Sequence, residues 1–186
     1  MNSKAMSIVG ASRNNGKRQN EDFYPTPGYV VDELLKREIF IGNIWEPACG
    51  DGAISKVLIN SGRKVSSSDL VYRGYGEQND FLKSDFIADN IITNPPFKNA
   101  IDFVSKAKVL SRNKIAMFLK TVFLEGSGRY EMFQDKEFPL KTVYQFCKRV
   151  SLYKNGEKMK NCGMIAYAWY VWDKSYVGKP TIEWIQ

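Results

Sequence analysis

The sequence contains no histidine, the side chain that enzymes use most often as a general acid, a general base or a metal ligand. Ser-His and Cys-His catalysis are therefore excluded, and so are the usual zinc sites. Cysteine is scarce too: Cys49, Cys147 and Cys162 show no CxxC spacing, and an odd count argues against a disulfide framework. We expect no metal centre, and any chemistry must proceed without an imidazole.

Long apolar runs are also absent. No stretch approaches the roughly 20 residues that a helix needs to cross a bilayer, and the polar N-terminus lacks the apolar core of a signal peptide. These absences predict a cytoplasmic protein with no membrane contact. Positive charge is in excess instead, because 27 Lys and Arg against 20 Asp and Glu give a net charge of +7. Such an excess favours a polyanionic partner, since each neutralised phosphate releases counterions.

The chain of 186 residues suits a single domain. Residues 1–20 are rich in Asn, Ser, Gly, Lys and Arg, and predict a flexible arm ahead of one domain at residues 21–186. Within that domain, helical periodicity alternates with short apolar runs. Helices are expected at residues 28–38, 53–61 and 100–110, and strands at residues 39–45, 64–68, 91–93, 115–119, 140–147 and 164–172.

The order of these elements predicts an α/β fold. Helices between successive strands imply a mainly parallel sheet with helices on both faces. Only a polar loop at residues 151–163 separates the last two expected strands, which predicts an antiparallel hairpin at the sheet edge. We find no internal repeat and no second domain.

A glycine-rich turn, residues 46–52, lies between the first expected strand and the helix that follows it. Gly50 and Gly52 can adopt backbone conformations that other residues avoid, and they let a ligand approach the main chain. Glu46, at the strand end, can accept a hydrogen bond from an ammonium group. The turn matches neither GxGxxG nor the P-loop pattern, which disfavours a dinucleotide or a nucleoside triphosphate. The alternative is a turn that only reverses the chain.

Two acids follow the second expected strand. Asp69 stands where α/β nucleotide-binding folds place an acid on ribose hydroxyls, although it can equally cap the next segment. Asp80 and Phe81 can pair an acceptor for an adenine amino group with an apolar contact to its ring. A loop acid beside a core aromatic is the alternative for that pair.

The most informative stretch is Asn94-Pro95-Pro96-Phe97, directly after an apolar strand. Two successive prolines fix φ twice and hold the carbonyls rigidly. The segment suits an adenine amino group, a poor nucleophile whose lone pair is delocalised into the ring. The Asn94 side-chain oxygen and the Pro95 carbonyl can accept hydrogen bonds from that amine, and Phe97 can stack on the base. The alternative is a rigid turn in which Asn94 caps a helix that starts near Lys98.

From residue 22 to about residue 184, the sequence resembles the class I, Rossmann-like methyltransferases, specifically the DNA N6-adenine methyltransferases of bacteria and phages. Asn94, Pro95, Pro96 and Phe97 match their catalytic signature of Asp, Asn or Ser, then two prolines, then an aromatic residue. The resemblance implies S-adenosylmethionine as the cofactor. The residues that it implies for cofactor binding are Thr26, Pro27, Glu46, Pro47, Gly50, Gly52, Asp69, Leu70, Asp80 and Phe81.

The fold that this resemblance implies is a Rossmann-like, mostly parallel seven-stranded sheet with helices on both faces and an antiparallel C-terminal edge hairpin. The chain departs from the family in size, because too little sequence follows Phe97 for a separate target-recognition domain. Nucleic acid must then be bound by the arm and two loops. The candidate phosphate contacts are Arg129, Lys154, Lys158 and Lys160, although exposed lysines are usually only a solvated face.

We therefore expect methyl transfer to N6 of a DNA adenine that is flipped out of the duplex, as in phage proteins or restriction–modification systems of a bacterial cell. Dimerisation is compatible with so small a recognition surface. The alternatives are the same chemistry on an RNA adenine or a protein glutamine, and a non-catalytic nucleic-acid-binding module on the same fold. Cytosine C5 methylation is disfavoured, since no Pro-Cys dipeptide is present to supply its thiolate.

Overall fold

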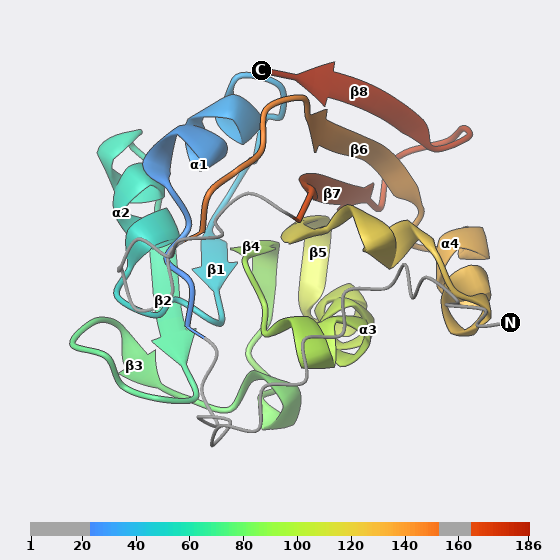
Figure 1. Ribbon diagram of the computed structural model, residues 1–186. Helices are drawn as coiled ribbons and strands as arrows, with labels where there is room; N and C mark the ends of the chain where they lie inside the picture. Colours follow the sequence, from blue (N-terminus) through green and yellow to red (C-terminus); the bar gives the residue numbers. More distant parts are fainter. Residues whose placement is uncertain (1–22, 153–164) are drawn as a thin grey trace, which may run out of the picture.

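The computed structural model describes residues 23–152 and 165–186, so the expected arm lies outside the described residues. Eight strands form one sheet in the order β3-β2-β1-β4-β5-β7-β6-β8 (Figure 1). The strands are β1 (Ile44–Glu46), β2 (Val65–Asp69), β3 (Glu77–Gln78), β4 (Ala88–Thr93), β5 (Ser111–Lys120), β6 (Leu140–Phe146), β7 (Tyr167–Asp173) and β8 (Thr181–Ile185). The α-helices are α1 (Gly28–Leu35), α2 (Ala53–Asn60), α3 (Ala100–Leu110) and α4 (Tyr130–Gln134).

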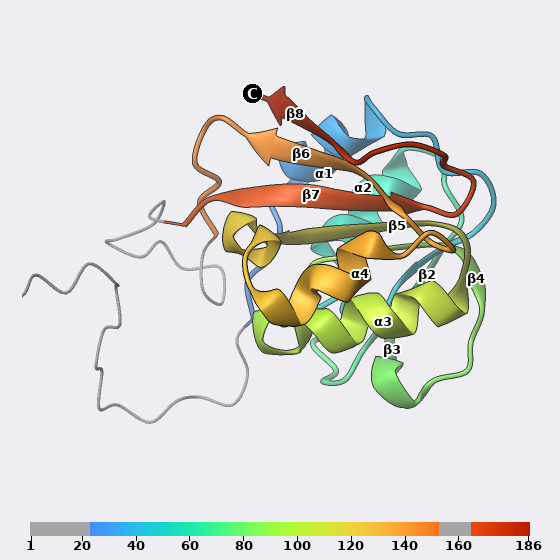
Figure 2. The same ribbon diagram turned by 90° about the vertical axis from the view of Figure 1, so that its right-hand side faces the viewer.

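The α/β class and the mostly parallel sheet are confirmed. Strands β3, β2, β1, β4 and β5 pair in parallel, β7 runs antiparallel to both β5 and β6, and β8 pairs in parallel with β6. The expected hairpin therefore exists, formed by β6 and β7. The sheet has eight strands rather than seven, and β8 instead of the hairpin forms its edge (Figure 2). Strand β8 was not predicted; it is short, and of its apolar residues only Ile185 is buried, whereas Ile182 and Trp184 are exposed.

The first strand is much shorter than predicted. Residues 39–45 read as one apolar run, but the Ile39 and Ile41 side chains are 75% and 76% exposed, and only Ile44–Glu46 pair with neighbouring strands. Gly42 and Asn43 interrupt the run ahead of the buried part. The apolar run therefore predicted too long a strand, because burial rather than residue type decides which part of the run enters the sheet.

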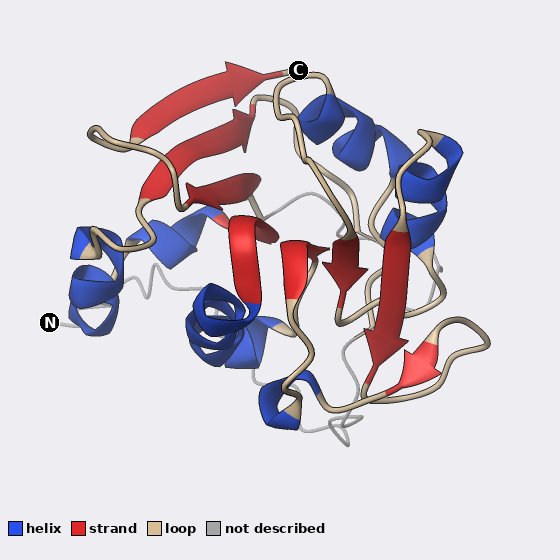
Figure 3. Ribbon diagram, turned by 180° about the vertical axis from the view of Figure 1, so that it is seen from behind, coloured by secondary structure: helices blue, strands red, loops and turns tan. Residues whose placement is uncertain are grey.

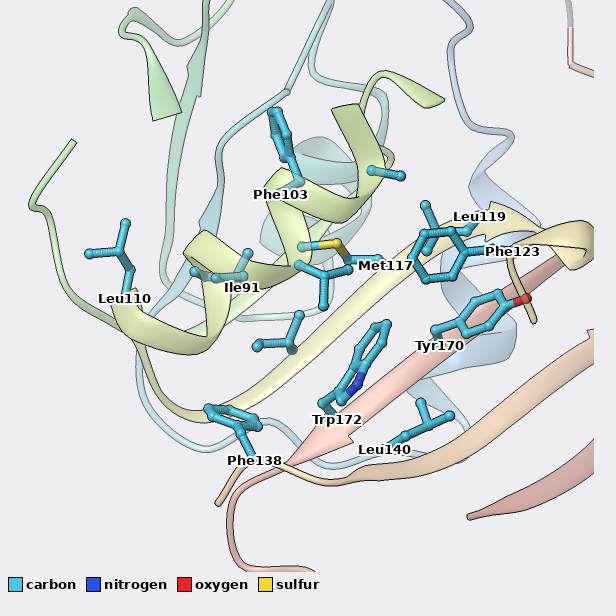
Figure 4. Close-up of a cluster of buried hydrophobic side chains, with 14 of the residues drawn as sticks. Ile91, Phe103, Leu110, Met117, Leu119, Phe123, Phe138, Leu140, Tyr170 and Trp172 are labelled. Atoms are coloured by element: carbon cyan, nitrogen blue, oxygen red, sulfur yellow. The ribbon is translucent and has the colours of Figure 1, made fainter. Parts of the chain in front are cut away.

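Helices lie on both faces of the sheet (Figure 3), and a cluster of buried apolar side chains lies on each face. Successive residues of a strand point to opposite faces, and the central strands follow this rule closely. Met117 and Trp172 face α3, whereas Phe118 and Trp169 face α1 and α2. Figure 4 shows side chains of the first layer, to which α3 contributes Phe103 and Leu110 and the sheet contributes Met117 and Trp172. The aromatic strand β7 is buried along its whole length, which confirms that it is core.

A buried ion cluster ties the end of α1 to the far part of the sheet. Glu38 is 1% exposed, and its carboxylate accepts hydrogen bonds from Lys114 Nζ (2.7 Å), Lys141 Nζ (2.8 Å) and the Tyr144 hydroxyl (2.9 Å). Burial raises the pKa of Glu38, but these three donors outweigh it and hold the pKa below its ordinary value. Residues far apart in sequence are thus joined around one charge.

Strands β4, β5 and β6 run in the same direction, so their carboxyl ends meet at one edge of the sheet. The N-terminal end of β7 lies at that same edge because β7 runs the opposite way. Open α/β sheets bind ligands beyond the carboxyl ends of their strands. Among the described residues, no helix is both long enough and apolar enough to cross a membrane.

Candidate active site

A cavity of about 300 Å³ opens at the carboxyl ends of β1, β2 and β4. Its volume falls in the range of small-molecule sites. It brings together most of the residues that the sequence singled out, although they come from five separate segments. The predicted residues that line it are Thr26, Glu46, Pro47, Asp69, Leu70, Asp80, Phe81, Asn94, Pro95, Pro96 and Phe97.

Asn94 is held by the segment ahead of α1. Its side-chain nitrogen donates to the Tyr24 carbonyl (3.2 Å) and to the Thr26 hydroxyl (3.0 Å). A backbone carbonyl can only accept, so this contact fixes which end of the amide is the nitrogen. The amide oxygen accepts no hydrogen bond within the described residues, and neither does the Pro95 carbonyl. Asn94 does not cap the helix after it, so the alternative of a simple capping turn is wrong.

Phe97 is half-buried beside a cation and two tyrosines. Lys120 Nζ lies 4.5 Å from the centre of its ring, and the Tyr167 and Tyr24 rings lie at centroid distances of 5.7 Å and 6.4 Å. A cation over an aromatic face is attracted by the ring quadrupole. The segment thus places two free carbonyl oxygens and an aromatic ring together, beside a lysine from β5.

Glu46 is buried at the end of β1, with its side chain against the start of α2. Its carboxylate accepts from the Ser55 backbone N–H (2.7 Å) and forms a short hydrogen bond with the Ser55 hydroxyl. Burial raises the pKa of Glu46 well above its ordinary value, and the nearby charges of Asp69 and Asp51 raise it further. Glu46 thus occupies one N-terminal amide of α2, which is then not available to a phosphate.

Asp69 lines the cavity at the end of β2 and also shapes its walls. One carboxylate oxygen accepts from the Gly50 N–H (2.8 Å) and the other from the Val71 N–H (3.0 Å). Asp69 thus makes the local backbone contacts of the capping interpretation and also lines the cavity, while its contact with a ribose stays a prediction. Each oxygen keeps further lone pairs for a ligand hydroxyl.

Asp80 and Phe81 both line the cavity, in agreement with the sequence. Asp80 also accepts from the Leu82 N–H (3.1 Å) and pairs with Lys83 Nζ (3.3 Å). The Phe81 ring is buried against Trp45 and Phe103. Asp80 and Phe81 therefore form part of the cavity wall, and they also act as a loop acid and a core aromatic residue.

Pro27, Gly50 and Gly52 do not line the cavity. Pro27 precedes α1, and its carbonyl accepts from the Val30 N–H. Gly52 has φ +83°, and a Cβ at that position would lie 2.6 Å from the Tyr75 ring. The Phe23 ring packs over Gly50 in a similar way. The space above both glycines is thus filled by the chain's own aromatic rings, not left open for a ligand as the sequence suggested.

The predicted nucleic-acid contacts are only partly described. Lys154, Lys158 and Lys160 lie outside the described residues. Arg129 is half-buried, bonds the Glu125 carbonyl and stacks 5.0 Å from the centre of the Phe123 ring. Its guanidinium therefore braces its own segment, and its contact with phosphate stays a prediction.

Sequence reasoning missed two basic residues near the site, Arg73 and Lys120. Arg73 lines the cavity and stacks 4.8 Å from the centre of the Phe23 ring. Lys120 ends β5, so the rule that parallel strands end at one edge could have placed it beside Asn94. Cys49 also lines the cavity, where burial raises the pKa of its thiol to about 12 and makes it a poor nucleophile. Within residues 23–152 and 165–186, no group of three or more potential metal ligands gathers.

Neither protein-family models nor curated protein sequences match this chain. Solved structures do match it. A protein from Pyrococcus horikoshii assigned as an RNA methyltransferase is 18% identical, with a TM-score of 0.64 over 82% of this chain and 87% of the other. The magnesium protoporphyrin IX methyltransferase of Synechocystis, solved with bound S-adenosylmethionine, is 14% identical, with a TM-score of 0.54 over 79% and 77%.

The M protein of the type I restriction enzyme EcoKI is a third match. It is 15% identical, with a TM-score of 0.59 over 82% of this chain, which spans only 44% of that protein. The chain therefore has the fold of the class I methyltransferases, with β7 antiparallel in an otherwise parallel sheet. The names of these three matches refer to different kinds of target, so the fold by itself does not select a substrate.

Proposed function

We propose that this protein uses S-adenosylmethionine to methylate the N6 amino group of adenine in DNA. The Asn94 amide is the observation that carries the proposal. Tyr24 and Thr26 engage its nitrogen, and its oxygen is left as an acceptor at a cavity where the Pro95 carbonyl is also unpaired within the described residues. Two fixed acceptors beside an aromatic ring suit a planar group that bears an amine.

The residues that line the cavity fit the cofactor. Glu46 is a buried carboxyl without a cation partner in the described residues, and an ammonium group would stabilise its ionised form. Asp69 offers acceptors for ribose hydroxyls, and Leu70 and Phe81 offer apolar contact to an adenine ring. When bound, S-adenosylmethionine supplies a methyl group on a positively charged sulfur, which keeps the electron pair of the broken bond.

This chain's own residues act on the acceptor amine. Asn94 Oδ1 and the Pro95 carbonyl accept hydrogen bonds from its N–H groups, which localises the lone pair on nitrogen. Phe97 stacks on the base, a contact worth about 1–3 kcal/mol. Holding the amine in line with the methyl group supplies much of the remaining rate enhancement, since positioning converts a bimolecular step into an intramolecular one. After the nitrogen is methylated, its surplus proton leaves to solvent.

Three observations support the choice of acceptor; the first favours nucleic acid in general, and the other two favour DNA. The chain carries a net charge of +7, its catalytic tetrapeptide resembles that of DNA adenine methyltransferases, and the EcoKI M protein shares its fold. RNA is the second candidate because the structure from Pyrococcus horikoshii is assigned to an RNA methyltransferase. The EcoKI M protein is more than twice as long as the part that this chain matches.

The test offers purified protein, with tritiated-methyl S-adenosylmethionine, three acceptors: an adenine-containing DNA oligonucleotide, its RNA counterpart and a glutamine peptide. Digestion and mass spectrometry then identify the product. We expect N6-methyl-2′-deoxyadenosine from the DNA. Label in RNA or peptide alone would contradict the DNA assignment, and a failure to bind S-adenosylmethionine in calorimetry would instead favour a non-catalytic binding module.

A further inference from the structure

Four basic side chains follow the carboxyl ends of three strands at the edge that holds Asn94. Lys98 comes after β4, Lys120 ends β5, and Lys148 and Arg149 come after β6. We call these four residues the basic rim. In Figure 2 the arrowhead of β6 marks this edge, on the left. Lys98, Lys148 and Arg149 are exposed, and Lys120 is half-buried over the Phe97 ring.

The rim charges are not neutralised by the described parts of the chain. None of the four forms an ion pair there, whereas Lys114 and Lys141 on the same strands are paired with Glu38. Basic residues whose role is to stabilise the fold are thus paired in the interior. Those of the basic rim keep their charge for solvent or a ligand.

The strands that carry the rim are rigid. The Tyr170 hydroxyl lies 3.2 Å from the carbonyl oxygens of both Lys120 and Thr121, and the Thr121 N–H donates to Ala166. After β6, the Cys147 N–H donates to Ile185 of β8, and Val150 is 1% exposed. The main chain that carries Lys120, Lys148 and Arg149 is therefore held by hydrogen bonds and packing, so little main-chain entropy is lost on binding.

The spacing of the rim follows from the sheet. Neighbouring strands lie about 4.8 Å apart, and β7 separates β5 from β6, so Lys148 and Arg149 start about 10 Å beyond the Lys120 strand. The rim therefore runs away from the amine-binding segment in one direction, along the sheet edge. A line of cations leading from a base-sized site matches a nucleic-acid strand, because phosphates flank every base.

We infer that the basic rim binds the phosphates that flank the target base, with Lys120 at the phosphate nearest to Phe97 and with Lys148 and Arg149 farther along the strand. This inference rests on the proposed function for its ligand class. It differs from the sequence-based candidates, since Arg129 braces its own segment. Lys120 has a further consequence: its ammonium covers part of Phe97 and must shift from the ring toward phosphate when a base stacks there.

The test measures equilibrium binding of a fluorescent 20-residue oligonucleotide, as DNA and as RNA, between 50 and 200 mM salt. It compares the wild type with Lys120→Gln and with the pair Lys148→Gln and Arg149→Gln. The matched control is Lys174→Gln with Lys179→Gln, which removes two exposed charges at the opposite edge of the sheet, where the Lys174 N–H donates to Asn113. Thermal melting checks that each variant is folded.

Each phosphate contact contributes about 0.7–0.9 to the slope of log affinity against log salt. We expect a slope smaller by about that amount for Lys120→Gln and by about twice that amount for the rim pair, with the control unchanged. Equal losses in rim and control variants would show diffuse attraction and overturn the inference, as would unchanged binding by the rim pair. A DNA arm or an RNA arm that responds alone identifies the polymer.

The result is separable from that of the proposed function. Weakened oligonucleotide binding by the rim variants, without any methyl transfer by the wild type, would support phosphate binding by the basic rim and contradict the methyltransferase proposal. Methyl transfer to DNA by the wild type, together with unchanged oligonucleotide binding by every rim variant, would support the methyltransferase proposal and overturn the inference about the basic rim.

Discussion

At the scale of single residues, Thr26 connects two parts of the site. Its hydroxyl oxygen accepts from the Asn94 amide, so its own hydroxyl hydrogen is free to donate to a ligand in the cavity that it lines. The resemblance to the methyltransferases assigns Thr26 to the cofactor, and the structure adds a role in orienting Asn94. Under the proposed function, this one small side chain contributes to both cofactor binding and acceptor binding.

Thr26→Val keeps the shape of the side chain and removes the acceptor for Asn94. We expect the rate constant for methyl transfer to fall by about tenfold, corresponding to roughly 1.4 kcal/mol for one lost hydrogen bond. Thr26→Ser should restore most of the rate. A Val variant with a normal rate and only a weaker cofactor affinity would show that Thr26 does not position Asn94.

The titration of Glu46 makes the stability of the folded protein depend on pH, and its raised pKa sets the direction of that dependence. Its pKa is raised in the folded protein, so its contribution to stability is complete below the unfolded pKa of about 4.5 and is lost as pH rises from there. The free energy of unfolding of the wild type, measured in urea, should therefore fall relative to that of Glu46→Gln between pH 5 and pH 7. The difference is at most about 1.4 kcal/mol per pH unit. Parallel curves for the two proteins would remove Glu46 as the titrating group.

At the scale of elements, the turn from β1 to α2 owes its shape to glycine. Gly52 and Gly62 share φ +83°, but a Cβ at Gly52 meets the Tyr75 ring at 2.6 Å, whereas one at Gly62 meets nothing within 4 Å. Both Ala variants pay for the left-handed backbone, about 1 kcal/mol. Only Gly52→Ala must also displace a ring beside the site.

We therefore expect Gly52→Ala to lower the free energy of unfolding by about 1–3 kcal/mol more than Gly62→Ala, the usual range for overpacking. Chemical denaturation measures both. Adding Tyr75→Ala should remove most of the extra loss, since it empties the space that the new methyl group needs. Equal losses in the two single variants would mean that the Tyr75 ring moves aside freely.

At the scale of the whole molecule, the Glu38 cluster joins the segment after α1 to strands β5 and β6. Glu38→Gln leaves Lys114 and Lys141 without their shared partner, which should cost about 3 kcal/mol, the lower end for buried pairs because both lysines are partly exposed. The matched control is Glu33→Gln, which breaks surface pairs on α1 and should cost less than about 1 kcal/mol. Similar losses in both variants would contradict a special role for the cluster.

Protonation of Glu38 in the same cluster lowers the stability of the fold at acid pH. The pKa of Glu38 is lowered, so its stabilising effect is present above the unfolded pKa of about 4.5 and is lost as pH falls below it. The midpoint of urea unfolding for the wild type should fall toward that of Glu38→Gln as pH decreases from 5 to 3. A constant difference over this range would assign the stabilisation to packing.

Periodicity and strand order predicted most of the fold, because they depend on local residue pattern. Helix α3 begins and ends where the sequence placed it. What failed depended on distant partners. Strand β8 joins the sheet by pairing with β6, and the exposure of Ile39 and Ile41 depends on elements far along the chain.

The same difference between local residue pattern and contacts with distant segments applies to the candidate site. Residue types and motif order predicted that Asn94, Glu46 and Asp69 share a cavity. They could not predict that Thr26 holds the Asn94 amide, or that Lys120 lies over Phe97, because both contacts join segments far apart in the sequence. Spatial juxtapositions of this kind require the fold.

The central claim is that Asn94 acts on the acceptor and not on the cofactor. Its most direct test is Asn94→Ala, with methyl transfer to an adenine-containing oligonucleotide and S-adenosylmethionine affinity measured on the same preparation. We predict that methyl transfer falls by at least a hundredfold, as when one preorganised polar group is lost from an active site, while the dissociation constant of S-adenosylmethionine stays within about threefold, or roughly 0.7 kcal/mol. Near wild-type methyl transfer by Asn94→Ala would contradict the account.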